Sequence, residues 1–301
     1  MKKFFELFWS SPHTLLILTT LMWAGHANVL KIAIGEVSPM LLMGFRWLGC
    51  FFILLVFLWS DVKANLPAVK QNIIWVFFMG GVGMAGFTIC LVIAAQYTSV
   101  INLGITQSFV PAIVMILGFI FFKISITREQ SIGLILSMLG ALILVSGGSL
   151  SPLLSLQFNF GDLIMLIGCL CYAGYTVGLT LRLKMPPAVL FVFFSFFASV
   201  TLSAFVVIEY LQGKMLWPNN VGWLSILYCI IFPSILSQTF FMRGVELIGA
   251  NQAGIYVNLV PIFTALMAIF LLSETIHIFH IVALFLVLSG IYIAEKYKVC
   301  N

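Results

Sequence analysis

Two stretches of the sequence decide the fold: residues 103–122 read LGITQSFVPAIVMILGFIFF, and residues 253–272 read AGIYVNLVPIFTALMAIFLL. Neither contains a charged residue, and each has the roughly 20 apolar residues that a helix needs to cross a bilayer. Each carries a glycine followed seven residues later by a proline, Gly104 and Pro111 in the first and Gly254 and Pro261 in the second. The same pattern 150 residues apart predicts two related halves.

The composition indicates that lipid is the solvent for most of the surface. Of the 301 residues, 62% are hydrophobic and only 8% are charged, whereas a soluble domain carries about 25% charged residues. The net charge of +5 comes from basic residues scattered singly between apolar runs, apart from Lys2-Lys3. That pattern is typical of a membrane topology signal, and it excludes a nucleic-acid partner.

The chain is therefore expected to be an all-α membrane protein with ten transmembrane helices. The first apolar run, from Leu15 to Ile34, has about 20 residues and is too long for the apolar core of a signal peptide. The expected helices lie at 14–34, 40–59, 72–93, 99–122, 130–148, 160–181, 187–209, 222–242, 252–272 and 278–296.

The repeat divides these helices into two sets of five, residues 1–150 and residues 151–301. Further matches between the halves are Gly140 with Gly290, and Trp75 with Trp223. Because five is odd, the second half enters the membrane from the opposite side. The sequence therefore predicts two inverted five-helix repeats (5+5), an arrangement characteristic of secondary transporters.

Lys and Arg in the short loops set the orientation, because cytoplasmic loops are enriched in both. Placing both termini in the cytoplasm leaves only Lys31 and Lys214 on the other side, with Arg46 inside the second helix. We therefore expect a multi-pass protein of the cytoplasmic (inner) membrane. The basic residues then on the cytoplasmic side are Lys2, Lys3, Lys63, Lys70, Lys123, Arg128, Arg182, Lys184, Arg243, Lys296 and Lys298.

Several short motifs resemble the ten-helix EamA branch of the drug/metabolite transporter superfamily over essentially the whole chain. They are Trp23-Ala24-Gly25, Gly35-Glu36-Val37-Ser38-Pro39, Arg46-Trp47, the segment from Gly254 to Pro261, Leu272-Ser273-Glu274 and Leu288-Ser289-Gly290. The resemblance implies proton- or gradient-linked, or facilitated, movement of a small organic metabolite. The stretch from Trp23 to Trp47 is similar to bacterial amino-acid exporters. One departure is Lys123-Ile124, where the family often has an acidic residue matching Glu274.

Polar and aromatic side chains inside the predicted helices are the candidates for a substrate cavity, because polar groups in a bilayer are costly. His26 lies near the midplane and could donate to a substrate carboxylate, relay a proton, or bond to a neighbouring backbone. Arg46 could pair with an anionic group, extend outward, or pair with Glu36 or a helix carboxyl end. The full set is Trp23, His26, Arg46, Thr106, Ser108, Tyr172, Tyr175, Gln238, Tyr256 and Asn258.

Helix-breaking residues mark the expected path. Pro111 and Pro261 each free a backbone carbonyl one turn back, near residues 107 and 257, and freed groups are tolerated only where protein or a wet cavity satisfies them. The candidates for kinks or gating are Gly104, Pro111, Pro233, Gly254 and Pro261. The alternative is a kink that only lets helices pack. We also predict that Trp23, His26, Tyr172 and Tyr256 converge on one cavity.

The function that these features favour is a secondary transporter that exports an amino acid or related compound by alternating access. The alternatives are a carrier for nucleotide- or phosphate-type metabolites, a channel, and an intramembrane lipid-modifying enzyme. Such an enzyme needs a group such as paired carboxylates, whereas the two aspartates, Asp61 and Asp162, are expected at helix ends on opposite sides of the membrane. His277 and His280 near Glu274 suggest a metal site, but a solvated helix start explains them. We expect no metal or other cofactor, a small-molecule substrate, and a monomer or homodimer.

Overall fold

The computed structural model describes residues 2–149, 158–272 and 276–296, and within these ranges it contains helices and no strand. Among the described residues, nine helices are long and apolar enough to cross a membrane. They are Pro12–Ile32, Pro39–Phe57, Ile73–Ala94, Val100–Phe122, Arg128–Val145, Phe160–Leu181, Pro187–Leu211, Asn220–Ile248 and Ile278–Lys296. The prediction of an all-α membrane protein is confirmed.

Several of these spans consist of consecutive shorter elements. The elements are α2 (Pro12–Ile32), α3 (Pro39–Phe57), α5 (Ile73–Phe77), η1 (Phe78–Met84), α6 (Ala85–Ala94), α7 (Val100–Gln107), α8 (Val110–Phe122), α9 (Arg128–Val145), α11 (Phe160–Gly178), η2 (Leu179–Leu181), α12 (Pro187–Leu211), α13 (Asn220–Ile230), η3 (Ile231–Leu236), α14 (Ser237–Ile248) and α17 (Ile278–Lys296). The run expected at 252–272 is helical from Ala250 to Leu272, as α15 (Ala250–Ile255), η4 (Tyr256–Asn258) and α16 (Leu259–Leu272).

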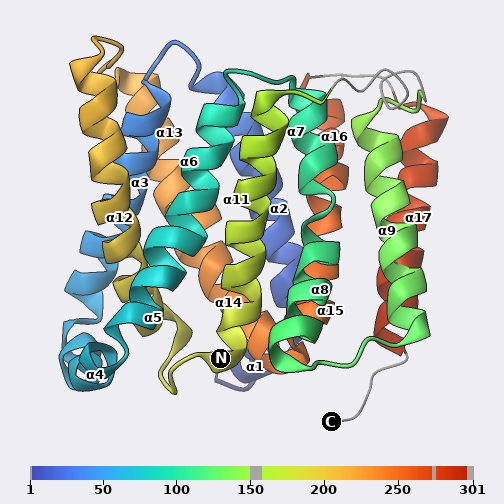
Figure 1. The fold of residues 1–301 in the computed structure, drawn as a ribbon, viewed down its shortest axis with the longest axis horizontal. Helices are drawn as coiled ribbons and strands as arrows, with labels where there is room; N and C mark the ends of the chain where they lie inside the picture. The colour runs from blue at the N-terminus through green and yellow to red at the C-terminus, as the bar shows by residue number, and fades with distance from the viewer. Residues whose placement is uncertain (1, 150–157, 273–275, 297–301) are drawn as a thin grey trace.

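Two expected boundaries are wrong. The segment from Asp61 to Lys70, expected as a loop, lies in helix α4 (Trp59–Gln71), which is seen end-on in Figure 1 and so lies across the direction of the long helices. The eighth helix ends at Ile248 rather than at 242, because Gly249 with a φ of 85° is the first residue that stops it. Arg243 therefore lies inside α14. A short helix α1 (Lys2–Trp9) also precedes the first span.

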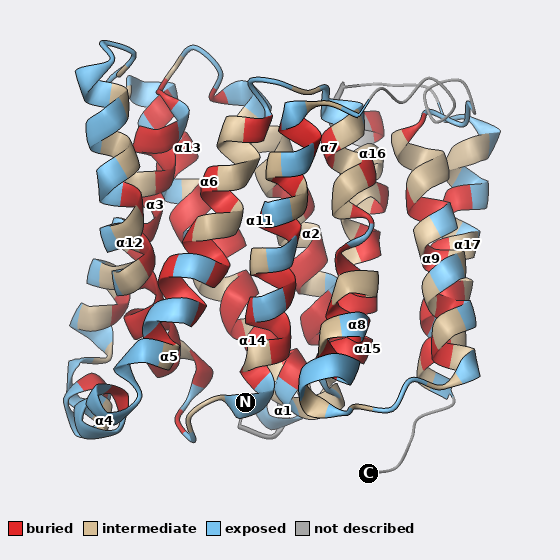
Figure 2. Cartoon of the chain, in the orientation of Figure 1, coloured by how far each residue is buried: buried red, intermediate tan, exposed pale blue. Residues whose placement is uncertain are grey.

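The long helices stand side by side, with α12 at one edge and the pair α9 and α17 at the other (Figure 1). The N-terminus, α1 and α4 share one end of the bundle. Buried residues gather where helices face one another, and exposed residues run along the outward faces (Figure 2). Many of these outward residues are large and apolar, among them Phe57, Phe121 and Phe285, which is the distribution that a lipid environment requires.

Glycines let α9 and α17 approach until their backbones touch. A Cβ on Gly290 would lie 2.5 Å from the carbonyl oxygen of Gly133, and one on Gly140 would lie 2.7 Å from that of Ala283. Small residues at such contacts are what allows tight helix packing in a membrane, where no hydrophobic force draws helices together.

Candidate functional site

A buried polar cluster lies where α2, α3, α11 and the η3–α14 segment meet. Helix α2 supplies Trp23 and His26, and α3 supplies Arg46. Helix α11 supplies Tyr172 and Tyr175, which are one turn apart and share a face. Segment η3 supplies Pro233 and Ser234, and Gln238 follows on α14.

Aromatic rings form one wall of this cluster. The Trp23 ring packs edge-on against Tyr172, with centroids 5.9 Å apart, and its other ring neighbour is Phe241 at 5.3 Å. Tyr172 in turn lies 5.6 Å from Tyr175. The Tyr175 hydroxyl donates to Gln238 Oε1 at 3.3 Å, so the side-chain amide of Gln238 lies next to these rings.

Arg46 is the charged member of the cluster, and it points into the protein. Its Nε donates to Ser234 Oγ at 2.5 Å, and a terminal nitrogen donates to the Pro233 carbonyl at 3.4 Å. The other terminal nitrogen lies 3.3 Å from His26 Nε2. A guanidinium can only donate, so His26 Nε2 accepts. Glu36, one of the partners expected for Arg46, instead accepts a hydrogen bond from Asn219.

The position of Ser234 follows from the proline before it. Pro233 has no N–H to give to the carbonyl of Cys229, four residues earlier. The Ser234 hydroxyl donates to that carbonyl at 2.7 Å. The same oxygen accepts from Arg46, so a proline-induced irregularity in one span holds the guanidinium of another. Sequence reasoning identified Pro233 but missed Ser234, whose signal was a hydroxyl directly after a proline within a span.

Two members of this region have buried polar atoms without a hydrogen-bond partner in the described structure. They are the Tyr172 hydroxyl and Trp47 Nε1, and the buried Ser237 hydroxyl at the start of α14 also has no such partner. The Trp47 ring lies under the Arg46 guanidinium at 4.8 Å. Trp47 follows Arg46 directly in one of the motifs that resemble the family, yet the sequence alone does not place it in the site. The buried amides of Asn251 and Gln252 on α15 also have polar atoms without such a partner.

Tyr256 belongs to a different cluster. Its hydroxyl donates to Glu295 Oε1 at 2.5 Å and lies 2.7 Å from His13 Nδ1. His13 and Glu295 are themselves 3.0 Å apart. The structure therefore gathers Trp23 with Tyr172, and His26 with Arg46, but it ties the Tyr256 hydroxyl to the first turn of α2 and the last turns of α17.

Three further candidates form local or interhelical bonds. Asn258 donates from Nδ2 to Ser137 Oγ at 3.0 Å and so joins η4 to α9. Ser108 bonds back to the Gly104 carbonyl and Thr106 to the Asn102 carbonyl. The Thr106 carbonyl lies 3.6 Å from Cys169 Sγ on α11.

The glycines and prolines predicted as kinks lie at or near interruptions in the helices. Helix α7 ends at Gln107 and α8 begins at Val110, directly before Pro111. The 3₁₀ element η4 separates Gly254 in α15 from Pro261 in α16. Gly104 allows close packing, since a Cβ there would lie 2.8 Å from Val145.

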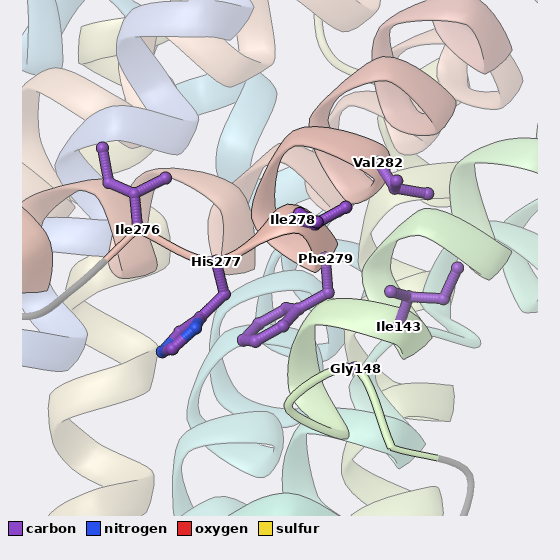
Figure 3. Close-up of a pocket in the computed structure, with 7 residues that line it drawn as sticks. All are labelled: Ile143, Gly148, Ile276, His277, Ile278, Phe279 and Val282. Atoms are coloured by element: carbon purple, nitrogen blue, oxygen red, sulfur yellow. The ribbon is translucent and has the colours of Figure 1, made fainter.

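A hollow of about 560 Å³ lies between the end of α9 and the beginning of α17 (Figure 3), and no residue of the polar cluster lines it. It is lined by Ile143, Gly148, Ile276, His277, Ile278, Phe279 and Val282. His277 and His280 stack with centroids 5.8 Å apart, whereas Glu274 lies outside the described residues. No group of three potential metal ligands occurs in the described ranges. Apart from His277, the residues that line the hollow have no polar side chain.

Comparison with known proteins identifies the family. Residues 10–146 and 159–295 each match the EamA-like transporter family. The chain is 26% identical to the uncharacterized transporter YyaM of Bacillus subtilis (strain 168), over 89% of this chain and 88% of YyaM. It is 25% identical to an uncharacterized transporter of Archaeoglobus fulgidus, over 94% of this chain and 97% of that protein.

A solved crystal structure has the same fold, with a TM-score of 0.78 and 16% identity, covering 95% of this chain and 97% of that one. The resemblance in the motifs is thereby confirmed, since the family matches both halves of the sequence. The chain is a transporter that belongs to the EamA-like transporter family.

Proposed function

We propose that this protein is a secondary carrier that exports a small organic metabolite, an amino acid or related compound, across the cytoplasmic membrane by alternating access. One observation carries the proposal: the buried polar cluster is built from both halves of the chain. Arg46 of the first half bonds to Ser234 and to the Pro233 carbonyl of the second. Alternating access requires a site at the interface of two repeats, near the midplane.

Contacts between equivalent residues support ten helices in two inverted repeats. Trp23 and Tyr172 are 149 residues apart in the sequence, at matching positions of the halves, and their rings touch. Residues related by a two-fold axis meet only close to that axis. The contact between α9 and α17 is also symmetric. At a shift of 150 residues Gly133 corresponds to Ala283 and Gly140 to Gly290, and Gly133 contacts Gly290 just as Ala283 contacts Gly140.

Matched interruptions of the helices also support the repeat. The third span contains the π-helix Phe78–Met84, and the eighth contains the π-helix Ile231–Leu236, 153 residues further on. Short π-helical turns are rare and often lie at functional sites. Such turns let a helix bend without losing its packing, which a carrier that rocks around a fixed site requires.

A polar cluster lies near the start of the first long helix of each half. His13, near the start of α2, meets Tyr256 and Glu295. Asp162 lies 149 residues later, near the start of α11. It accepts from Thr98 at 2.6 Å and from Asn102 at 3.2 Å. In the proposed cycle, one cluster opens while the other stays closed.

Counterflow in proteoliposomes tests the carrier. Vesicles containing the purified protein are loaded in turn with pooled amino acids, organic acids, nucleotide derivatives and organic phosphates, and uptake of the matching labelled compound is followed. We expect saturable exchange with the amino-acid or organic-acid pool, reduced in His26→Ala and retained in His280→Ala, whose ring lies outside the cluster. Exchange with no pool, in protein that melts cooperatively, would refute the proposal and favour the enzyme.

A further inference from the structure

We propose that Arg46, Trp47 and Tyr172 bind the carboxylate of a monoanionic substrate whose apolar body packs against the rings of Trp23 and Phe241. This assignment rests on the proposed carrier function and deepens it by naming the substrate class.

The charge of Arg46 has no counterpart in the described structure. The side chain is 6% exposed, and its neighbours Ser234, the Pro233 carbonyl, His26, Met43 and the Trp47 ring are all neutral. The acidic residues that do form ion pairs, Glu246 and Glu295, pair with Arg182, Arg243 and His13 instead. A buried cation without a partner is strongly unfavourable, so a ligand that brings one negative charge would stabilise the site.

The hydrogen-bond inventory indicates the same ligand, because two buried side chains carry a donor that has no acceptor. Trp47 is 2% exposed and Tyr172 is 8% exposed. Trp47 Nε1 has no partner within the described ranges, and the Tyr172 hydroxyl, although it lies near the Gln238 amide, makes no hydrogen bond of good geometry. An indole N–H can only donate, and an ionised carboxylate can only accept. One carboxylate has lone pairs for the guanidinium, the indole and the phenol, and such charge-assisted bonds are the strong ones.

The number of positive charges favours a carboxylate over a phosphate. His26 accepts from Arg46 and is therefore neutral, so the cluster described here holds one positive charge. A monoanion neutralises that charge, whereas a dianionic phosphate would leave an uncompensated negative charge in the membrane, which is costly. The adjoining wall is made of Trp23, Phe241 and Phe87, the last 5.2 Å from Tyr172. An apolar or aromatic group fits this wall.

Ligand binding to the purified carrier in nanodiscs tests the assignment without transport. The probes are phenylacetate, benzoate and 4-methylpentanoate, each beside its neutral amide, with phenyl phosphate as the dianion, and the readout is the unfolding temperature against concentration. We expect at least one carboxylate to bind about tenfold or more tightly than its amide, and Arg46→Gln to remove that difference. Lys31→Gln, which deletes a charge from an exposed position on α2, is the matched control and should keep it.

A second pair of variants tests whether a negative charge from the protein itself can replace the carboxylate of the ligand. Ser234→Asp places a carboxylate beside the guanidinium, and Ser234→Asn is its neutral isostere. We expect Ser234→Asp to melt at a higher temperature than Ser234→Asn and to lose carboxylate binding. Equal melting of the two variants would show that Arg46 needs no counter-charge and would overturn the proposal.

The outcomes separate this site from the carrier function. Carboxylates that bind no better than their amides, phenyl phosphate that binds more tightly than every carboxylate, or binding that survives Arg46→Gln would each overturn the site. If the protein exchanges a neutral compound, and Arg46→Gln does not change this counterflow, the carrier function stands and the proposed site is refuted. Arg46-dependent carboxylate binding without counterflow of that carboxylate would establish the site and refute the carrier.

Discussion

The environment of Arg46 shows what a single residue reveals in a membrane sequence. Its position inside a span signals a costly group and hence a partner. The sequence offered three kinds of partner, and the structure uses none of the acidic ones: the side chain turns inward to Pro233 and Ser234. Those residues lie more than 180 positions away, and nothing local to Arg46 indicates them.

Tyr172 and Tyr175 allow a prediction at the residue scale. The Tyr172 hydroxyl makes no hydrogen bond of good geometry in the described structure, whereas the Tyr175 hydroxyl bonds to buried Gln238. Tyr172→Phe should therefore leave the free energy of unfolding nearly unchanged but weaken carboxylate binding. Tyr175→Phe should lower that free energy by about 1 kcal/mol, because the amide loses its donor. Thermal unfolding of the two variants without ligand checks this; a larger loss in Tyr172→Phe would contradict it.

Within the eighth span, Pro233 interrupts the helix and thereby places Ser234 beside Arg46. Pro233→Ala restores an N–H that can bond to the Cys229 carbonyl, in competition with the Ser234 hydroxyl that now fills this role. We expect equal or higher thermal stability together with slower counterflow, because Ser234 no longer holds Arg46 in place. A variant with unchanged transport would show that the irregular turn serves packing alone.

The contact between α9 and α17 gives a second prediction at the scale of helical elements. Gly290→Ala should lower the free energy of unfolding by about 1–3 kcal/mol, since its methyl group would lie 2.5 Å from the Gly133 carbonyl oxygen. Gly174→Ala is the matched control, because nothing lies within 4 Å of its added Cβ. That change should be neutral or stabilising by up to about 1 kcal/mol, through helix propensity. Thermal unfolding in detergent compares the two, and equal effects would argue against the close contact.

Orientation in the membrane is a property of the whole molecule. Lys63 and Lys70 lie in α4, at the end of the bundle that holds the N-terminus (Figure 1), whereas Lys214 lies beyond the opposite end of α12. With the native cysteines replaced, Lys63→Cys should react with a membrane-impermeant maleimide only in inverted vesicles, and Lys214→Cys in intact cells. The reverse pattern would overturn the predicted cytoplasmic termini.

The sequence by itself determined which segments form long apolar helices and most of their bounds. Length and hydropathy are local properties, and a span of about 20 apolar residues has few alternatives to a helix in lipid. The repeated glycine–proline pattern also indicates two related halves without any knowledge of contacts. Helix α4 was not predicted, because it lies outside the apolar runs.

Only the tertiary structure decided which polar groups meet. The sequence predicts that Tyr256 joins Trp23, His26 and Tyr172, yet its hydroxyl bonds to His13, 243 residues away. Trp23 and Tyr172 do meet, because they lie where the two halves face each other. The physical reason is that a buried polar group must be satisfied by whatever partner the packing brings within about 3 Å, and the direction of each side chain depends on helix crossings that no single segment specifies.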